Sequence, residues 1–333
     1  MTFMKTILGG SAALALTAGA ALAEPALMYD MGGKFDKSFN EAAYNGAKRW
    51  AEETGQNYQE IEVTAEAQRV QFATRLAEAG YNPIVVLGFA NAATMEEVAP
   101  KYPDTKFAII DVNWLDIPNL QQISFAEHEG SYLVGMLAAM ASENDTVGFI
   151  GGMDVPLIRH FACGYAQGAK AVNPDVKVVA NMTGTTPAAW NDPVKGGELT
   201  KSQISQGADV VYAAAGGTGV GVLQAAADGD ILSIGVDSNQ NYLHPGKVLT
   251  SMLKRVDNAV YDVFAAGEDG FEPGVHVMGL DNDGVGYAVD EFNEMLITDE
   301  MRAAVDEARQ KIIDGEIEVA SYYENDSCPA LEF

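Results

Sequence analysis

The sequence predicts an α/β fold made of two doubly wound lobes. Short runs rich in Val and Ile alternate along the chain with longer stretches whose apolar residues have helical spacing. This alternation is typical of βαβ units, whose parallel strands are buried on both faces of a sheet. About three such units precede Asn113 and about three follow Thr146, with no low-complexity linker between them. We therefore expect two similar lobes, each with its own core, joined by short crossing segments.

The first 23 residues have the pattern of an export signal. Lys5 precedes an apolar run, Ile7–Ala20, and Ala21-Leu22-Ala23 fits a small-x-small cleavage site. The run is shorter than the roughly 20 residues that a membrane span needs. We expect cleavage after Ala23 and an exported, soluble mature protein, with a plain N-terminal anchor as the alternative. No cysteine lies at the cleavage point, so a lipid anchor is not expected.

The mature chain then alternates between expected strands and helices. The strands are expected at Ala26–Tyr29, Ile84–Leu87, Phe107–Ile110, Val147–Ile150, Val176–Ala180, Val210–Ala213 and Ile231–Gly235. The helices are expected at Glu41–Glu53, Gln68–Glu78, Ser131–Ser142, Pro156–Lys170 and Val194–Gln206, with a charged outer helix at Asp299–Asp314. A helix between consecutive strands is the connection that a parallel sheet requires.

Most of the expected strands are followed directly by a polar residue or a glycine. These residues are Asp30, Gly88 with Phe89, Asp111, Gly151 with Gly152, Gly216 with Gly217, and Asp237. In open parallel sheets, ligands bind at the carboxyl ends of the strands. A cleft between two such edges would be lined from both lobes. The three aspartates fit acid–base catalysis, hydrogen bonding to sugar hydroxyls, or capping of the next helix.

The segment "MGGKFDKSFN", residues 31–40, joins the first strand to the first helix. It lacks the G-x-x-x-x-G-K-[ST] pattern, so it is not a P-loop. Ser38 followed by Glu41 matches a capping box, which is a structural role. Phe39 is placed either to pack in the core or to stack on a planar ligand, and Asn40 follows it. Trp190, in a loop ahead of a helix, has the same two interpretations.

The glycine-rich stretch "AAAGGTGVGVLQAA", residues 213–226, contains fragments that resemble G-x-G-x-x-G. A single match of this kind is weak evidence for a dinucleotide site, because that motif usually opens its domain. The two compatible interpretations are a tight strand-to-helix turn and backbone N–H groups directed at a ligand's polar atoms.

No catalytic, metal or cofactor site is expected from the motifs. The four histidines show no H-E-x-x-H spacing, and neither a G-x-S-x-G elbow nor a C-x-x-C pair is present. We expect His128, His160, His244 and His276 to be surface or satisfied residues. An oxidising compartment allows one disulfide between Cys163 and Cys328, with two buried thiols as the alternative.

The charge excludes some partners. Asp and Glu number 47 against 20 Lys and Arg, which gives a formal net charge of -27. A surface this acidic repels nucleic acid and anionic lipid, so neither is expected as a partner. It also disfavours a polyphosphate ligand.

Several motifs together resemble the basic membrane protein family, whose members are substrate-binding proteins and include purine nucleoside receptors of ABC transporters. The resemblance is carried by "YDMGGKFDKSFNEAAYNGA", "FAIIDV", "AEHEGSYLVGMLAAM", "VGFIGGMDVPLIRHFACGYAQGAK", "WNDPVKGGE", "VYAAAGGTGVGVLQAA" and "IGVDSNQ", and runs from about residue 26 to about 315. It implies a type I periplasmic binding protein fold, in which two Rossmann-like lobes are joined by three crossovers. It also implies a periplasmic, monomeric receptor that closes on its ligand and delivers it to a permease and an ATPase.

The resemblance also assigns roles to residues. Phe39 resembles the residue that stacks on one face of a purine, and Trp190 stands where the family usually has a phenylalanine for the other face. The remaining implied contacts are Asn40 for the base edge, Asp237 from the second lobe, Asp111 and Lys254 for the ribose, and Asp30, Phe89 and the Gly216-Gly217 backbone around the pocket. The implied ligand is adenosine, guanosine or inosine. The tryptophan leaves the preferred base open.

The resemblance gives expected lobe boundaries. The N-terminal lobe is expected to contain residues 24–128 and about 252–282, and the C-terminal lobe residues 129–251 and about 283–333. Two alternative functions stay open at this point. One is an exported nucleoside hydrolase, and the other is the same receptor fold with a sugar or a signalling ligand.

Overall fold

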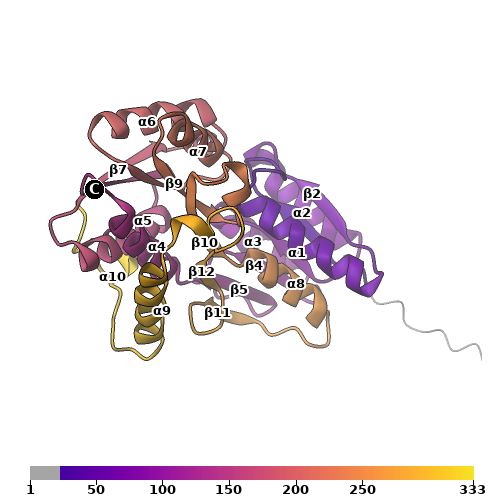
Figure 1. Cartoon of the computed structure of the whole chain (residues 1–333). Helices are drawn as coiled ribbons and strands as arrows, with labels where there is room; N and C mark the ends of the chain where they lie inside the picture. Colours follow the sequence, from indigo (N-terminus) through magenta and orange to yellow (C-terminus); the bar gives the residue numbers. More distant parts are fainter. Residues whose placement is uncertain (1–22) are drawn as a thin grey trace, which may run out of the picture.

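The N-terminal lobe is built around a six-stranded, all-parallel sheet (Figure 1). The computed structural model describes residues 23–333. The strand order is β11 (Gly274–Met278), β5 (Leu120–Phe125), β4 (Phe107–Ile110), β3 (Ile84–Val86), β1 (Ala26–Tyr29) and β2 (Gln59–Glu62). The lobe's helices are α1 (Phe39–Thr54), α2 (Arg69–Glu78), α3 (Ala92–Val98) and α8 (Val256–Ala266). Strands β1, β3 and β4 are buried throughout, because helices cover both faces of the sheet.

The C-terminal lobe contains a second six-stranded sheet. Its order is β12 (Val285–Tyr287), β10 (Val248–Lys254), β9 (Leu232–Asp237), β8 (Val210–Ala214), β6 (Thr146–Met153) and β7 (Lys177–Gly184). Only the pairing of β12 with β10 is antiparallel. The helices are α4 (Glu127–Ala141), α5 (Pro156–Val172), α6 (Pro193–Ser205), α7 (Thr218–Asp228), α9 (Asp299–Ile313) and the short α10 (Tyr322–Asn325). Helices α4 and α5 pack closely, since a Cβ at Gly168 would lie 1.9 Å from the carbonyl oxygen of Tyr132.

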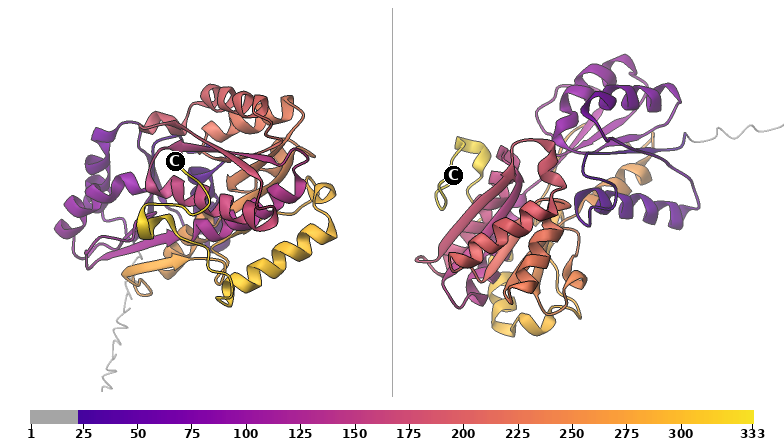
Figure 2. Two further views of the ribbon diagram at one scale, coloured as in Figure 1. Left: turned by 90° about the vertical axis from the view of Figure 1, so that its left-hand side faces the viewer. Right: turned by 90° about the horizontal axis from the view of Figure 1, so that it is seen from above.

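The chain passes between the two sheets three times, so the predicted two-lobed, doubly wound fold is confirmed. The crossings follow β5 at Ala126, follow β10 at Arg255, and connect β11 to β12 through residues 279–284. Seen from above, the lobes lie side by side and meet at a narrow waist (Figure 2). The exact boundaries of the two lobes expected from the sequence stay a proposal.

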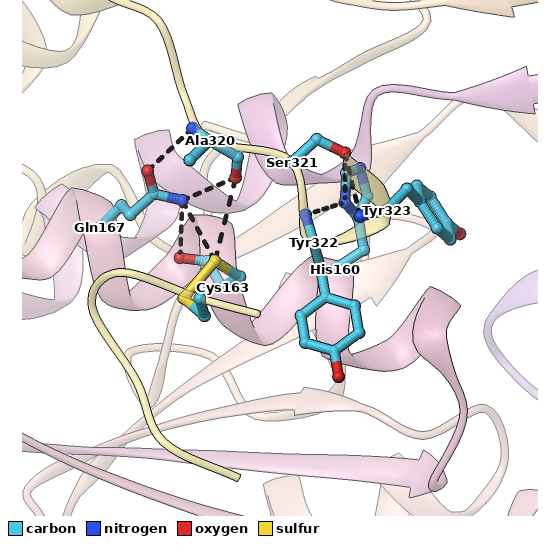
Figure 3. Close-up of a disulfide and its surroundings, with 8 residues drawn as sticks. His160, Cys163, Gln167, Ala320, Ser321, Tyr322 and Tyr323 are labelled. Atoms are coloured by element: carbon cyan, nitrogen blue, oxygen red, sulfur yellow. Dashed lines mark hydrogen bonds between the residues drawn. A yellow bond between two sulfur atoms is a disulfide. The ribbon is translucent and has the colours of Figure 1, made fainter. Parts of the chain in front are cut away.

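A C-terminal segment, residues 320–333, packs along α5 on the side away from the N-terminal lobe (Figure 2). A disulfide joins Cys163 of α5 to Cys328, with 5.5 Å between their Cα atoms (Figure 3). The side-chain amide of Gln167 both donates to and accepts from the backbone of Ala320, each at 2.9 Å. The backbone N–H of Tyr322 donates to Nδ1 of His160 at 3.3 Å.

The expected export signal lies almost wholly outside the described residues, and its cleavage stays a prediction. Across residues 23–333, no helix has both the length and the apolar character needed to span a bilayer.

Candidate ligand-binding site

A cavity lies between the carboxyl edges of the two sheets. Its empty volume, with the open space at its mouth included, is about 590 Å³. The predicted residues that line it are Asp30, Phe39, Asn40, Phe89, Asp111, Trp190, Gly216, Asp237 and Lys254. Gly217 does not line the cavity; it precedes α7 at its N-cap. The lining also includes Gly88, which was expected at the same sheet edge, and residues that sequence reasoning missed: Met31, Asp36, Leu157, Ile158, Phe161, Ala214, Ala215 and Val236.

Aromatic side chains enter the cavity from both lobes. Phe39 and Phe89 come from the N-terminal lobe, and Phe161 and Trp190 from the C-terminal lobe. The Trp190 indole lies directly over Gly152, where a Cβ would come within 2.2 Å of the ring. A glycine is therefore required at that position. Both lobes thus offer apolar ring surfaces to a flat ligand.

Two threonine hydroxyls hold the loop that carries Trp190, and that of Thr183 donates to the carbonyl oxygen of Ala189 at 3.1 Å. Thr218 Oγ1 donates to the carbonyl oxygen of Ala189 at 2.7 Å and accepts from the backbone N–H of Asp192 at 2.7 Å. Thr218 is the first residue of α7, directly after the glycine-rich turn. The turn therefore helps to hold the tryptophan in place.

Asp30 is held by a buried arginine. Arg69 at the start of α2 lies with Nη1 2.7 Å from Asp30 Oδ1, and both side chains are largely buried. Gly88, with φ +86°, leaves room for this carboxylate, because a Cβ there would lie 2.3 Å from Asp30 Oδ2. Burial raises the pKa of Asp30, although Arg69 opposes the shift. Part of the hydrogen-bonding capacity of Asp30 is therefore used within the protein.

Asn40 is also engaged within its own lobe. Its side-chain N–H groups donate to the carbonyl oxygens of Asp30 and Gly33, both at 3.2 Å, and its Oδ1 accepts from the N–H of Asp30 at 3.1 Å. These bonds shape the loop between β1 and α1. Only a free lone pair on Oδ1 is left for a ligand.

The predicted capping box at Ser38 and Glu41 is wrong. Ser38 is at the N-cap position of α1, but its side chain does not cap the helix. Asp36 caps it instead, accepting from the N–H groups of Ser38, Asn40 and Glu41 at 2.8–3.1 Å. Burial raises the pKa of Asp36 to about 7, although these donors pull it down. The hydroxyl of Ser38 is thereby free to donate to the Asp237 carboxylate of the other lobe.

Further hydrogen bonds join the segment before α1 to the C-terminal lobe. Ser238 Oγ donates to the carbonyl oxygen of Ser38 at 3.1 Å, and the side-chain amide of Gln240 donates to the carbonyl oxygen of Lys37 at 2.9 Å. Together with the Ser38–Asp237 bond they hold the two lobes against each other at one side of the cavity.

Two of the strand-end aspartates have a backbone conformation that L-residues rarely adopt. Asp111 follows β4 with φ +68°, and Asp237 ends β9 with φ +62°. Such strained residues cluster at functional sites, where the surrounding structure holds them. Here the strain lies at the carboxyl edges of both sheets.

Lys254 is the cation at the centre of the site. Its side chain is 2% exposed, and Nζ lies 2.7 Å from Asp111 Oδ1 and 3.1 Å from Glu127 Oε1. The same ammonium lies 5.1–5.5 Å from the ring centres of Phe39, Phe125 and Phe161. Burial by itself lowers the pKa of Lys254, but the surrounding carboxylates outweigh it, so the pKa is raised and the amine stays charged.

A pair of histidines lies behind this cation. The rings of His128 and His160 are 4.2 Å apart, and His160 Nε2 is 3.9 Å from Glu127 Oε2. Burial lowers the pKa of His128 to about 4, and burial together with the neighbouring His128 and Lys254 lowers that of His160 to about 2. His160 is satisfied by the Tyr322 N–H, whereas Nδ1 of His128 has no partner among the described residues.

These depressed pKa values predict a pH effect on stability. In the unfolded chain His160 takes up a proton below about pH 6.5, but in the folded protein it stays neutral down to about pH 2. His160 therefore destabilises the fold as the pH falls below 6.5, by at most about 1.4 kcal/mol per pH unit. Replacing His160 with glutamine should remove this loss between pH 6.5 and 4.5, as measured by urea unfolding of both proteins. Parallel curves for the two proteins would contradict it.

Comparison with known proteins identifies the family. The family described as "ABC transporter substrate-binding protein PnrA-like" matches residues 23–322. A "CD4+ T-cell-stimulating antigen" of Listeria monocytogenes is 33% identical over 319 residues, covering 88% of this chain and 87% of that protein. The "ABC transporter nucleoside-binding protein BmpA" of Lactococcus lactis is 32% identical over 320 residues, covering 89% of this chain and 88% of that protein.

A solved structure shows the same architecture. A solute-binding protein of an ABC transporter system from Aeropyrum pernix matches with a TM-score of 0.83 and 30% identity, covering 91% of this chain and 95% of that one. The resemblance in the motifs is therefore confirmed across residues 23–322. The protein belongs to the PnrA-like, or basic membrane protein, family of ABC transporter substrate-binding proteins.

Proposed function

We propose that the protein is the periplasmic receptor of an ABC importer for purine nucleosides. It captures the nucleoside between the lobes and delivers it to a permease and its ATPase. The observation that carries the proposal is the meeting of aromatic rings from both lobes with the strand-end carboxylates Asp111 and Asp237 in one cavity. The Lactococcus relative, named as nucleoside-binding, supports the same ligand class.

The chemistry of the cavity suits a nucleoside. Phe39 and Trp190 offer rings to the two faces of a base, and such stacking contributes about 1–3 kcal/mol per base. Carboxylates accept hydrogen bonds from the ribose hydroxyls. Lys254 is already paired with Asp111 and Glu127, so it offers little attraction to a phosphate in a chain of net charge -27. A neutral nucleoside is therefore favoured over a nucleotide.

The family consists of binding proteins and is not an enzyme class. The alternative of a nucleoside hydrolase would need several carboxylates free to act near the N-terminus. Asp30 is paired with Arg69, and Asp36 caps α1, so both carboxylates already have structural roles. We therefore propose a receptor without catalytic activity.

The test is to identify the bound molecule directly. The mature protein is purified without added ligand and denatured, and released small molecules are identified by mass spectrometry. Adenosine, guanosine and inosine are then titrated by calorimetry. A ligand of about 19 non-hydrogen atoms at about 0.5 kcal/mol each predicts a sub-micromolar Kd. Preferential binding of a sugar, or release of free base and ribose, would overturn the proposal.

Removing either ring should weaken nucleoside binding. We expect Phe39→Ala and Trp190→Ala each to raise the Kd by roughly 5- to 150-fold, corresponding to about 1–3 kcal/mol of lost stacking. Trp114 is 61% exposed and does not line the cavity, so Trp114→Ala is the matched control and should bind as the wild type does. Unchanged affinity in both cavity variants would exclude stacking by these rings.

A further inference from the structure

Glu127 is a buried carboxylate at the hinge that does not line the cavity. It is the first residue of α4, directly after the first crossing between the lobes, and it is 1% exposed. Lys254 is the last residue of β10, directly before the second crossing. The 3.1 Å contact between Glu127 Oε1 and Lys254 Nζ therefore joins two of the three crossings.

The same ammonium reaches into the other lobe. Asp111 follows β4 of the N-terminal sheet, and its Oδ1 is 2.7 Å from Lys254 Nζ. The Lys254 ammonium thus lies between a carboxylate of each lobe, inside a shell of phenyl rings. Away from water, an ammonium is held by its ionic partners and not by solvent. The carboxylates of Glu127 and Asp111 together fix the position of the ammonium. If Asp111 were its one partner, the ammonium would move with Asp111.

We propose that Glu127 is a positioning residue for the ligand site. It holds the Lys254 ammonium on the C-terminal side of the hinge, so that Asp111 is drawn to a fixed place when the lobes are closed and presents its other oxygen to the ligand. Glu127 does not touch the ligand itself. The ligand part of this role rests on the proposed function, and the effect on Lys254 does not.

Among the groups around Glu127, Lys254 is its positively charged partner. Its second oxygen faces His160 Nε2 at 3.9 Å, and that imidazole is neutral because burial lowers its pKa. Asp111 and Asp237 are the other charged groups near Lys254, and burial raises the pKa of Asp237. Burial raises the pKa of Glu127 to about 7, whereas Lys254 opposes the shift, so pairing with Lys254 is what stabilises the charge of Glu127 at the first turn of α4.

The first experiment measures guanosine and adenosine affinity by calorimetry, with thermal unfolding to establish that each variant is folded. We expect E127Q, which keeps shape but removes charge, to raise the Kd by at least about thirtyfold. E127D should recover part of this loss. The matched control is E129Q: Glu129 lies on the same turn and accepts from the N–H of Leu280, away from Lys254, so wild-type affinity is expected. In a Lys254→Met background E127Q should not weaken binding further, because the ammonium that Glu127 positions is gone, and it should restore part of the lost stability by removing one of the two unpaired buried carboxylates.

The second experiment needs no ligand. Reductive methylation with formaldehyde and a borohydride is followed at Lys254 by peptide mass spectrometry. Loss of the Glu127 charge should make Lys254 react at least about tenfold faster in E127Q than in the wild type or E129Q. Equal reactivity in all three proteins would overturn the proposal whatever the ligand is. If the wild type bound no nucleoside while E127Q still exposed Lys254, the proposed function would fail and the Glu127–Lys254 link would stand. Wild-type affinity in E127Q would overturn the role in binding.

Discussion

Replacing Lys254 with methionine is expected to lower the free energy of unfolding by about 3–5 kcal/mol. The change leaves the buried carboxylates of Asp111 and Glu127 without their cation, and removing one partner of a buried ion pair typically costs this much. Urea unfolding followed by circular dichroism measures the loss. Nucleoside binding should fall with it, because both carboxylates then repel each other across the hinge.

The stability loss of Lys254→Met should also depend on pH. Burial raises the pKa of Glu127 to about 7, although Lys254 opposes the shift. Without Lys254 this pKa rises further above its unfolded value near 4, and stability is lost as the pH rises through the folded-state pKa. The deficit of Lys254→Met should accordingly be smaller at pH 5 than at pH 8.

Arg255 provides a matched control. It is the next residue in the chain and pairs with Asp257 at 2.9 Å, but its side chain is 31% exposed and that of Asp257 is 24% exposed. Such partly solvated pairs contribute at most about 1 kcal/mol. If Arg255→Met proved as destabilising as Lys254→Met, burial of the pair would not explain the effect.

The architecture followed from local pattern because parallel strands buried on both faces must be apolar. The expected strands Ala26–Tyr29 and Phe107–Ile110 coincide with β1 and β4. The residues directly after them, Asp30 and Asp111, could be placed in one site because the carboxyl ends of parallel strands share an edge. That rule needs no knowledge of packing.

Strands that contain polar residues were not predicted by the same reasoning. β2, "QEIE", is an edge strand with two exposed and two partly buried residues, so it lacks an apolar run. β10 is buried but contains Thr250 and Ser251. Their hydroxyls donate to the carbonyl oxygen of Ala288 and to Asn241 Oδ1, both at 2.8 Å. A polar residue becomes acceptable inside a sheet only through such partners, which the local pattern does not reveal.

The wrong assignment at Ser38 has the same physical origin. The capping pattern fits locally, but Asp36 makes better use of the helix start, and the partner of Ser38 is a carboxylate 199 residues away in the other lobe. The local pattern could not predict which residues of α5 line the cavity either. Its spacing shows an apolar stripe but not that Ile158 and Phe161 face a cavity. Long-range contacts decide both cases.

Removing the disulfide should cost about 2–5 kcal/mol of unfolding free energy. The bond between Cys163 and Cys328 spans a sequence separation of 165 residues, and closing so long a loop restricts the unfolded chain strongly. Cys328→Ser in the mature protein, compared with the wild type by urea unfolding without reductant, measures the loss. Reductant should then destabilise the wild type and leave the variant unchanged.

The same change tests how the C-terminal segment supports the site. Its contacts with α5 run along one helix face through His160, Cys163 and Gln167, while Ile158 and Phe161 of the same helix line the cavity. The bonds from Gln167 and His160 hold Ala320 and Tyr322 without the disulfide, so α5 should keep its place. We therefore expect Cys328→Ser to lose stability but keep its nucleoside affinity within about threefold. Gln167→Ala added to Cys328→Ser also removes both amide hydrogen bonds to Ala320. A fall in affinity only in that double variant would show that the segment braces the cavity wall.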